Sequence, residues 1–295
     1  MPHRKSATSS AKHRYAVRIV LIFLVPLLIS YGGANWYLWA HQRQLIFFPS
    51  RDLRQTPADV DLKYEEVWVP IGGDPSVSLN GWLLQSGDPA ALTILYLHGS
   101  DANLGGNVER IARLNQMGFA VLAVDYRGYG KSGGGFPSEI QVYEDAEAAW
   151  NYLVQARHVD PGQAFIYGHS IGGAIAIELA LRHPEAAGVI VESTFTSIPE
   201  VAKSAYWMFP ADWLLNQRFD SLAKVPMLRT PVLFVHGTAD TEVPYAMSER
   251  LFNAASGSKS LTLIPGGGHE DSARAGETLY THALLAFMQN IQSSR

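Results

Sequence analysis

The sequence predicts an α/β fold with a mostly parallel, doubly wound sheet. Short apolar runs typical of buried strands alternate with helix-like stretches along most of the chain. Such alternation is typical of parallel sheets that carry helices on both faces. Polar side chains directly follow several of these runs, at the edge where open parallel sheets place their functional sites. With 295 residues, 47% of them hydrophobic and 17% charged, the chain can bury the core of one such domain.

The N-terminal segment has the composition of a membrane-spanning signal-anchor. Residues 19–40 carry no charge, and aromatic residues gather near their far end, as in the aromatic belt of a membrane interface: Trp36, Tyr37 and Trp39. A stretch of about 20 such residues spans a hydrocarbon core of about 30 Å. Residues 1–18 form a basic tail. The positive-inside rule therefore predicts a cytoplasmic tail, with the rest of the chain on the periplasmic or extracellular side.

A cleaved signal peptide is the alternative for this segment. Residues 30–32 loosely fit the small-x-small pattern of a cleavage site. We favour the uncleaved anchor because the apolar stretch continues beyond that site and because the basic region before it is long.

Residues 45–292 form one predicted domain. It opens with an antiparallel hairpin over residues 64–70 and 77–85. Apolar runs predict buried parallel strands, and longer segments between them predict helices. The expected strands are 92–97, 120–125, 164–167, 188–192, 232–236 and 261–264, and the expected helices are 107–117, 138–156, 173–181, 245–255 and 274–291. An insertion over 195–228 interrupts the alternation.

A candidate nucleophile lies between the strand at 164–167 and the helix that follows it. Residues 168–172 read G-x-S-x-G, with Ser170 at the centre. On such a tight turn the serine hydroxyl is held above the sheet edge, and glycines are needed where strand and helix backbones come close. The motif therefore predicts that Ser170 is a nucleophile.

A carboxylate and an imidazole follow two later strands, in the order expected for a Ser-His-Asp triad. Asp240 follows the strand at 232–236, and His269 follows the strand at 261–264. A serine needs a base to take its proton, and a carboxylate must orient that base and stabilise its charged form. We assign these roles to His269 and Asp240. Glu192, at the end of another strand, is the alternative acid.

The negative charge that develops during attack on a carbonyl needs hydrogen-bond donors. The backbone N–H of Ile171, directly after the nucleophile, is one expected donor. The second is expected from the His98-Gly99-Ser100 turn after an earlier strand, and we assign it to the Ser100 N–H, with the N–H of Asp101 as the alternative.

Five motifs together resemble a known family. They lie at residues 97–99, 125–132, 168–172, 236–240 and 268–269. The chain resembles, over about residues 45–290, α/β-hydrolases of the BEM46-like, serine aminopeptidase S33-like (Hydrolase_4) group. That resemblance implies the α/β-hydrolase fold and a Ser170, Asp240, His269 triad, and it leaves the substrate open. Asp101 departs from the neutral residue common in relatives, and we expect its carboxylate to point to solvent.

The insertion at 195–228 predicts a small helical cap that sets substrate preference. It is rich in aromatic residues and lies between the strands that carry nucleophile and acid. We expect four of these side chains to line an acyl pocket: Tyr206, Trp207, Phe209 and Trp213. The alternative is that the aromatics only pack the cap onto the sheet.

Composition and motifs argue against several other functions. The net charge of −4, with no basic run beyond the N-terminus, argues against nucleic acid. Residues 128–133 fit G-x-G-x-x-G but lead into a loop, so no nucleotide site is expected. The chain has no cysteine, which excludes disulfides and thiolate ligands. The expected histidine-metal spacings are missing, so we expect neither a metal nor a cofactor.

Three functional hypotheses follow. The first is a membrane-anchored serine hydrolase that cleaves an ester or thioester of a lipid-like or acylated substrate through an acyl-serine intermediate. The second is a serine aminopeptidase-like peptidase. The third is a non-catalytic binding module that keeps the fold, against which the complete set of three side chains argues.

Overall fold

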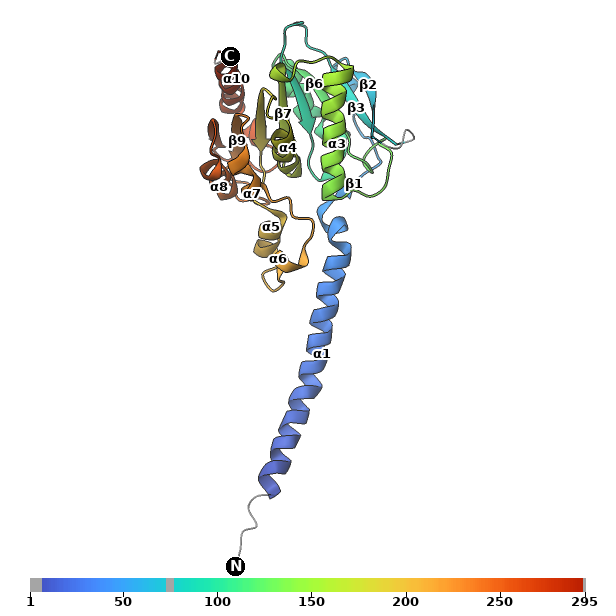
Figure 1. The fold of residues 1–295 in the computed structure, drawn as a ribbon, viewed down its shortest axis with the longest axis vertical. Helices are drawn as coiled ribbons and strands as arrows, with labels where there is room; N and C mark the ends of the chain where they lie inside the picture. Colours follow the sequence, from blue (N-terminus) through green and yellow to red (C-terminus); the bar gives the residue numbers. More distant parts are fainter. Residues whose placement is uncertain (1–6, 73–76, 294–295) are drawn as a thin grey trace, which may run out of the picture.

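A long N-terminal helix extends away from the body of the protein (Figure 1). The structure, a computed structural model, describes residues 7–72 and 77–293. Helix α1 (Ala7–Ile46) continues past both ends of the predicted segment 19–40 and leads directly into β1 (Phe48–Pro49). It is long and apolar enough to cross a membrane, and its apolar stretch is not buried against the protein. The first six residues of the predicted basic tail lie outside the described residues.

An eight-stranded sheet forms the centre of the domain, in the order β10-β9-β8-β7-β4-β6-β3-β2. Its neighbouring strands are parallel from β10 to β6, and β3 and β2 are antiparallel. The predicted mostly parallel sheet with an opening hairpin is therefore confirmed. The strands are β2 (Glu65–Pro70), β3 (Ser78–Leu84), β4 (Thr93–Leu97), β6 (Ala120–Val124), β7 (Ala164–His169), β8 (Gly188–Glu192), β9 (Val232–Gly237) and β10 (Lys259–Ile264). A separate short strand, β5 (Asp101–Ala102), pairs with β1.

Helices cover both faces of the sheet, as in a doubly wound fold. One buried apolar cluster joins the sheet to α2 (Val108–Gln116) and α10 (Glu277–Ser293). A second cluster joins the opposite face to α3 (Glu139–Asn151), α4 (Ile171–Arg182) and α8 (Ala246–Ala254). A π-helical turn, Tyr152–Ala156, extends α3 to the predicted end of that helix. Short 3-10 turns lie at Pro57–Val60, Leu104–Asn107, Pro161–Gln163 and Val225–Met227.

The closing helix predicted over 274–291 is two helices. A short α9 (Ser272–Ala275) is followed by Gly276, and α10 begins at the next residue. Gly276 lies so close to β10 that a Cβ there would be 2.5 Å from Cγ2 of Ile264. Its backbone departs from helical angles, with φ −131° and ψ 47°, which explains the break.

The insertion divides between two places. Helices α5 (Ile198–Ala205) and α6 (Ala211–Leu214) form a small cap on the side of the domain from which α1 leaves (Figure 1). The third helix, α7 (Ser221–Lys224), packs beside α4, where Lys224 forms an ion pair with Glu178 at 2.8 Å. The cap is therefore smaller than the predicted range 195–228.

Candidate active site

Ser170 occupies a strained turn between β7 and α4. Its backbone has φ 55° and ψ −121°, a conformation that residues other than glycine rarely adopt. A Cβ at Gly168 would lie 2.0 Å from the carbonyl oxygen of Gly172, and a Cβ at Gly172 would lie 2.1 Å from that of Leu97. Glycine is therefore required at both positions, and the turn presents the Ser170 hydroxyl beyond the end of the strand.

The structure brings the three predicted side chains into one hydrogen-bonded chain. His269 Nε2 lies 3.0 Å from Ser170 Oγ, and His269 Nδ1 lies 2.7 Å from Asp240 Oδ2. Because Nδ1 faces a carboxylate it carries the ring proton, which leaves Nε2 free to accept the proton of Ser170. Asp240 and His269 are each only 8% exposed, so the chain is shielded from water except at the serine.

Asp240 is held by partners on both of its oxygens. Oδ1 accepts the backbone N–H of Glu242 at 2.9 Å and of Val243 at 2.8 Å. Oδ2 accepts from His269 and lies 3.0 Å from Nε2 of His236, whose other nitrogen lies 2.7 Å from the Ser248 hydroxyl. Sequence reasoning places His236 only in a motif and misses this contact, although His236 precedes Asp240 by four residues.

These contacts shift the pKa values of both Asp240 and His269. Burial opposes ionisation of Asp240, but hydrogen bonds from His236, His269 and the Val243 amide outweigh it and place the carboxyl pKa well below its ordinary value. For His269, burial lowers the pKa, whereas the hydrogen bond and charge of Asp240 raise it, and the net shift is upward. At neutral pH, His269 therefore lies beside an ionised carboxylate that raises its basicity.

Glu192, the alternative acid, is engaged elsewhere. Its buried carboxylate accepts hydrogen bonds from Tyr167 and Ser272 and lies 3.5 Å from Nε of Arg110. Among the described residues it makes no hydrogen bond to His269. Glu192 therefore joins β8 to neighbouring elements through a buried polar network. The sequence does not predict the hydrogen-bond and ion-pair partners that occupy this carboxylate.

Ser100 and Ile171, whose backbone N–H groups are the predicted oxyanion donors, lie beside the serine. Ser100 and Ile171 both line a cavity together with Ser170. In the part of the chain that the structure describes, neither N–H donates to a protein acceptor, so both can serve a ligand. Asp101 is exposed to solvent.

The two other histidines near the turn are buried and neutral. Burial lowers the pKa of His98 to about 4 and that of His169 to about 3. His98 Nδ1 lies 2.7 Å from the carbonyl oxygen of Gly99, and His169 Nε2 lies 3.0 Å from that of His269. Both rings support the backbone of the site.

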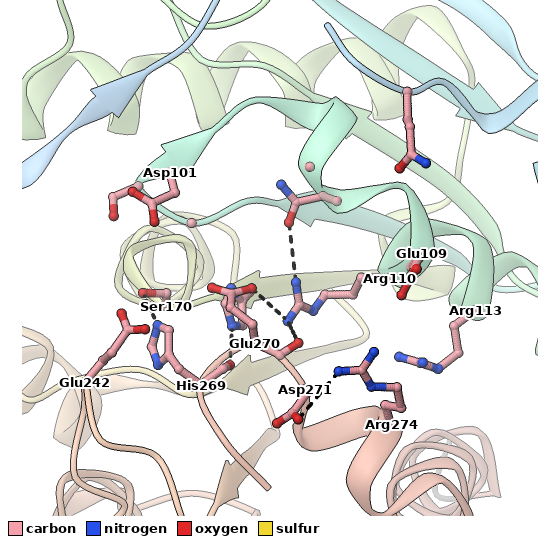
Figure 2. A pocket seen from close by; sticks show the side chains of 16 residues that line it. Asp101, Glu109, Arg110, Arg113, Ser170, Glu242, His269, Glu270, Asp271 and Arg274 are labelled. Carbon is pink, nitrogen blue, oxygen red and sulfur yellow. Dashed lines mark hydrogen bonds and ion pairs between the residues drawn. The ribbon is translucent and has the colours of Figure 1, made fainter. Parts of the chain in front are cut away.

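Ser170 and His269 lie where an apolar cavity meets a polar cleft. The cavity, of about 270 Å³, lies beneath the cap. The cleft, of about 470 Å³, extends from Ser170 toward two guanidinium groups, those of Arg113 and Arg274. Figure 2 shows Ser170 and His269 at one end of this cleft, and the two arginines at the other. The serine therefore lies between an apolar and a polar space.

Two of the four predicted pocket aromatics line the cavity and two do not. Tyr206 and Phe209 are part of its wall. Trp207 and Trp213 are 81% and 93% exposed and are not part of its wall. Tyr206, Trp207 and Phe209 lie in the connection between α5 and α6, and Trp213 lies on α6, so residues that cluster in sequence do not share one face.

Helix α1 supplies part of the cavity wall, which the sequence did not predict. Leu38, Gln42, Leu45 and Ile46 line the cavity opposite the cap. Gln42 Oε1 accepts the backbone N–H of Asn216 at 2.8 Å. The candidate membrane helix is therefore part of the site itself.

Three side chains near the serine have the donor atoms that a metal ion would need. Ligand-type atoms of His169, His269 and Glu270 lie within 4.8 Å of one another. Both nitrogens of His269 already bind Ser170 and Asp240. A cation held there by His269 would break the hydrogen-bonded chain, so the expectation of a metal-free reaction stays a prediction.

This fold and this turn define an α/β-hydrolase, and comparisons with known proteins agree. The profile of a family described as serine aminopeptidase, S33, matches residues 88–223. Protein bem46 of Schizosaccharomyces pombe is 32% identical over 268 residues, 84% of this chain and 85% of that protein. Uncharacterized protein Rv2307c of Mycobacterium tuberculosis is 33% identical over 258 residues, 85% of this chain and 88% of that protein.

A solved structure shares the fold. The esterase PF2001 of Pyrococcus furiosus superposes with a TM-score of 0.67 at 19% identity, over 83% of this chain and 98% of that one. The chain therefore belongs to the α/β-hydrolase superfamily, in the BEM46-like group related to the S33 family. The resemblance read from the motifs is confirmed, and the family is one of hydrolases.

Proposed function

We propose that this protein is a membrane-anchored serine hydrolase that cleaves an ester or thioester of a lipid-like or acylated substrate. The observation that carries the proposal is the hydrogen-bonded chain from Ser170 through His269 to Asp240, placed at the junction of an apolar cavity and a polar cleft. This arrangement matches the roles of nucleophile, base and orienting carboxylate.

The reaction follows from the positions of these atoms. Ser170 Oγ attacks the carbonyl carbon while its proton passes to His269 Nε2, and Asp240 stabilises the resulting imidazolium. The N–H groups of Ser100 and Ile171 stabilise the oxyanion. The His269 proton then passes to the leaving alcohol or thiol as its bond to carbon breaks. Water, deprotonated by His269, releases the acid from acyl-Ser170.

The two cavities support an amphipathic substrate. An acyl chain fits the apolar cavity under Tyr206 and Phe209, and a polar leaving group fits the cleft. We infer neither a nucleotide nor a nucleic acid as partner, and the mechanism uses no cofactor.

The peptidase alternative finds less support in the cap. A free amino terminus would need an acidic group available to bind it, and the three acids of the insertion are engaged. Glu200 pairs with Arg250, Asp212 pairs with Lys203 at 2.5 Å, and Asp220 accepts the Ala223 N–H at 3.1 Å. The carboxylates are therefore already neutralised or used as a helix cap.

We also propose that α1 anchors the protein in a membrane. An uncleaved α1 would hold the protein in a membrane with residues 1–18 in the cytoplasm and the catalytic domain on the other side. The protein should resist carbonate extraction, and a C-terminal alkaline phosphatase fusion should be active. Recovery of a soluble mature form that begins near Gly33 would contradict the anchor.

A panel of substrates tests the reaction class. p-Nitrophenyl esters with acyl chains of two to sixteen carbons should be hydrolysed, and aminoacyl p-nitroanilides should not. Ser170→Ala and His269→Ala should each lower kcat by about 10³ or more, with an unchanged circular dichroism spectrum. Equal turnover of the anilides would favour the peptidase, and no turnover of either class would favour a binding module.

A further inference from the structure

The tip of the cap contacts α1 far from the point where that helix joins the domain. The Tyr31 hydroxyl donates to the carbonyl oxygen of Met208 at 2.9 Å. The rings of Tyr31 and Phe209 stack with centroids 6.0 Å apart and planes 7° apart. Gln42 and Arg43 bind the domain nearer the helix end, with Arg43 Nε 2.7 Å from the Pro137 carbonyl oxygen. Contacts at separate heights therefore fix the cap relative to α1.

These contacts set the depth of the cap tip along α1. The aromatic residues Trp36 and Trp39 are 65% and 51% exposed, as expected of side chains at a membrane interface. Tyr31 precedes them by five and eight residues, which at 1.5 Å per residue places it about 7 to 12 Å deeper. The cap tip at Met208 lies at the same depth as Tyr31, inside the interface that the tryptophans mark.

The tip also has the surface that this depth requires. Four of its exposed residues are large and apolar or aromatic, with exposed fractions of 58% for Tyr206, 81% for Trp207, 58% for Met208 and 93% for Trp213. Side chains of this kind favour the boundary between headgroups and acyl chains. The tip contains one charged residue, Asp212, which pairs with Lys203 at 2.5 Å, and this pairing reduces the cost of bringing the two charges near lipid.

The apolar cavity reaches this level. Leu38, adjacent in sequence to Trp39, lines the cavity together with Ser170 and Phe209. The wall formed by α1 and the cap thus runs from the level of the interface to the serine. An acyl chain in the neighbouring leaflet can follow this wall without crossing water.

We propose that the cap tip, residues 206–213, inserts into the leaflet beside α1, and that the substrate is a bilayer-resident acyl lipid that enters the cavity sideways from that leaflet. This inference rests on the proposed function, since it needs both the anchor and the acyl-serine chemistry. Trp207 and Trp213, which do not line the cavity, then hold the cavity entrance in the lipid.

Depth measurements test the insertion. The chain has no cysteine, so single cysteines can carry a nitroxide label in the full-length protein, reconstituted in phosphatidylcholine and phosphatidylglycerol vesicles. We compare Met208→Cys with Trp36→Cys on α1 and with Gln289→Cys, an exposed position on α10. The label at 208 should be accessible to oxygen, protected from a water-soluble nickel complex, and deeper than the label at 36.

The control labels separate the possible failures. If the label at 208 is as exposed to water as the one at 289 while that at 36 is at the interface, the insertion is wrong and the anchor stands. If the label at 36 is itself in water, the anchor is wrong, and the insertion fails with it.

Activity measurements test the route. The double variant Trp207→Ser/Trp213→Ser should lose about tenfold or more in kcat/KM toward 4-methylumbelliferyl palmitate in vesicles and keep its activity toward water-soluble p-nitrophenyl acetate. Trp68→Ser is the matched control, because Trp68 is 50% exposed on β2, away from the cap. Equal losses on both substrates, or no loss on either, would overturn lateral entry.

Discussion

Replacing Asp240 by asparagine should lower kcat because the structure determines which way the new amide faces. Oδ1 of Asp240 accepts two backbone N–H groups, from Glu242 and Val243. The asparagine oxygen must take that position, because an NH₂ group there would face two donors. The NH₂ group then points at His269 Nδ1 and His236 Nε2. Because it can only donate, His269 must expose an unprotonated Nδ1 to it.

The consequence is the wrong tautomer of His269. With Nδ1 unprotonated, the ring proton moves to Nε2, which lies 3.0 Å from Ser170 Oγ. That nitrogen can no longer accept the serine proton. We expect kcat to fall by about 10²- to 10³-fold, or about 3 to 4 kcal/mol in activation free energy. The loss should be smaller than for Ser170→Ala, which removes the nucleophile.

The assay is the initial rate of p-nitrophenyl butyrate hydrolysis at saturating substrate, with urea unfolding of each variant as the measure of folding. Glu242→Gln is the control for charge, because it removes a nearby negative charge and leaves the hydrogen bond between Asp240 and His269 in place. It should lower kcat much less. Near wild-type activity of Asp240→Asn, together with loss of activity in Glu192→Gln, would refute our assignment of the acid.

Three further results are expected. Because catalysis needs neutral His269, whose pKa is raised by Asp240 despite burial, kcat/KM should be lost as pH falls through a single ionisation above about 6.5; a flat profile between pH 5 and 8 would contradict this. EDTA should leave the rate unchanged, whereas loss restored by a divalent cation would point to metal binding at His169, His269 and Glu270. In Gly172→Ala the new Cβ would lie 2.1 Å from the Leu97 carbonyl oxygen, so urea unfolding should show a fold destabilised by about 3 kcal/mol or more. Gly135→Ala is the control, because no atom lies within 4 Å of a Cβ there, and it should not destabilise the fold. Equal urea midpoints for the two variants would show that the turn tolerates a side chain.

The sequence predicted those features that depend on local pattern and on the order of strands. The glycines at 168 and 172 indicate a tight turn in which no residue with a side chain fits at these two positions. The carboxyl ends of parallel strands meet at one edge, so Ser170, Asp240 and His269 could be expected to lie close together before their distances were known.

Features that depend on distant contacts could not be predicted in this way. Tyr31 and Met208 are separated by 177 residues, and no local pattern reports that α1 and the cap form one wall. The buried partners of Glu192 likewise come from three different elements. Clustering in sequence predicts Trp207 and Trp213 in the pocket, whereas Trp207, in the connection after α5, and Trp213, on α6, are exposed.

The most direct test of the acyl-serine mechanism is to identify the residue that a fluorophosphonate modifies. The full-length protein in detergent is treated with the probe, and intact mass and peptide mass spectra are recorded for the wild type and for Ser170→Ala. We expect one adduct per chain, on the peptide that contains Ser170, and none in the variant. An adduct that persists in Ser170→Ala, or an unmodified wild-type protein that still hydrolyses esters, would contradict the account.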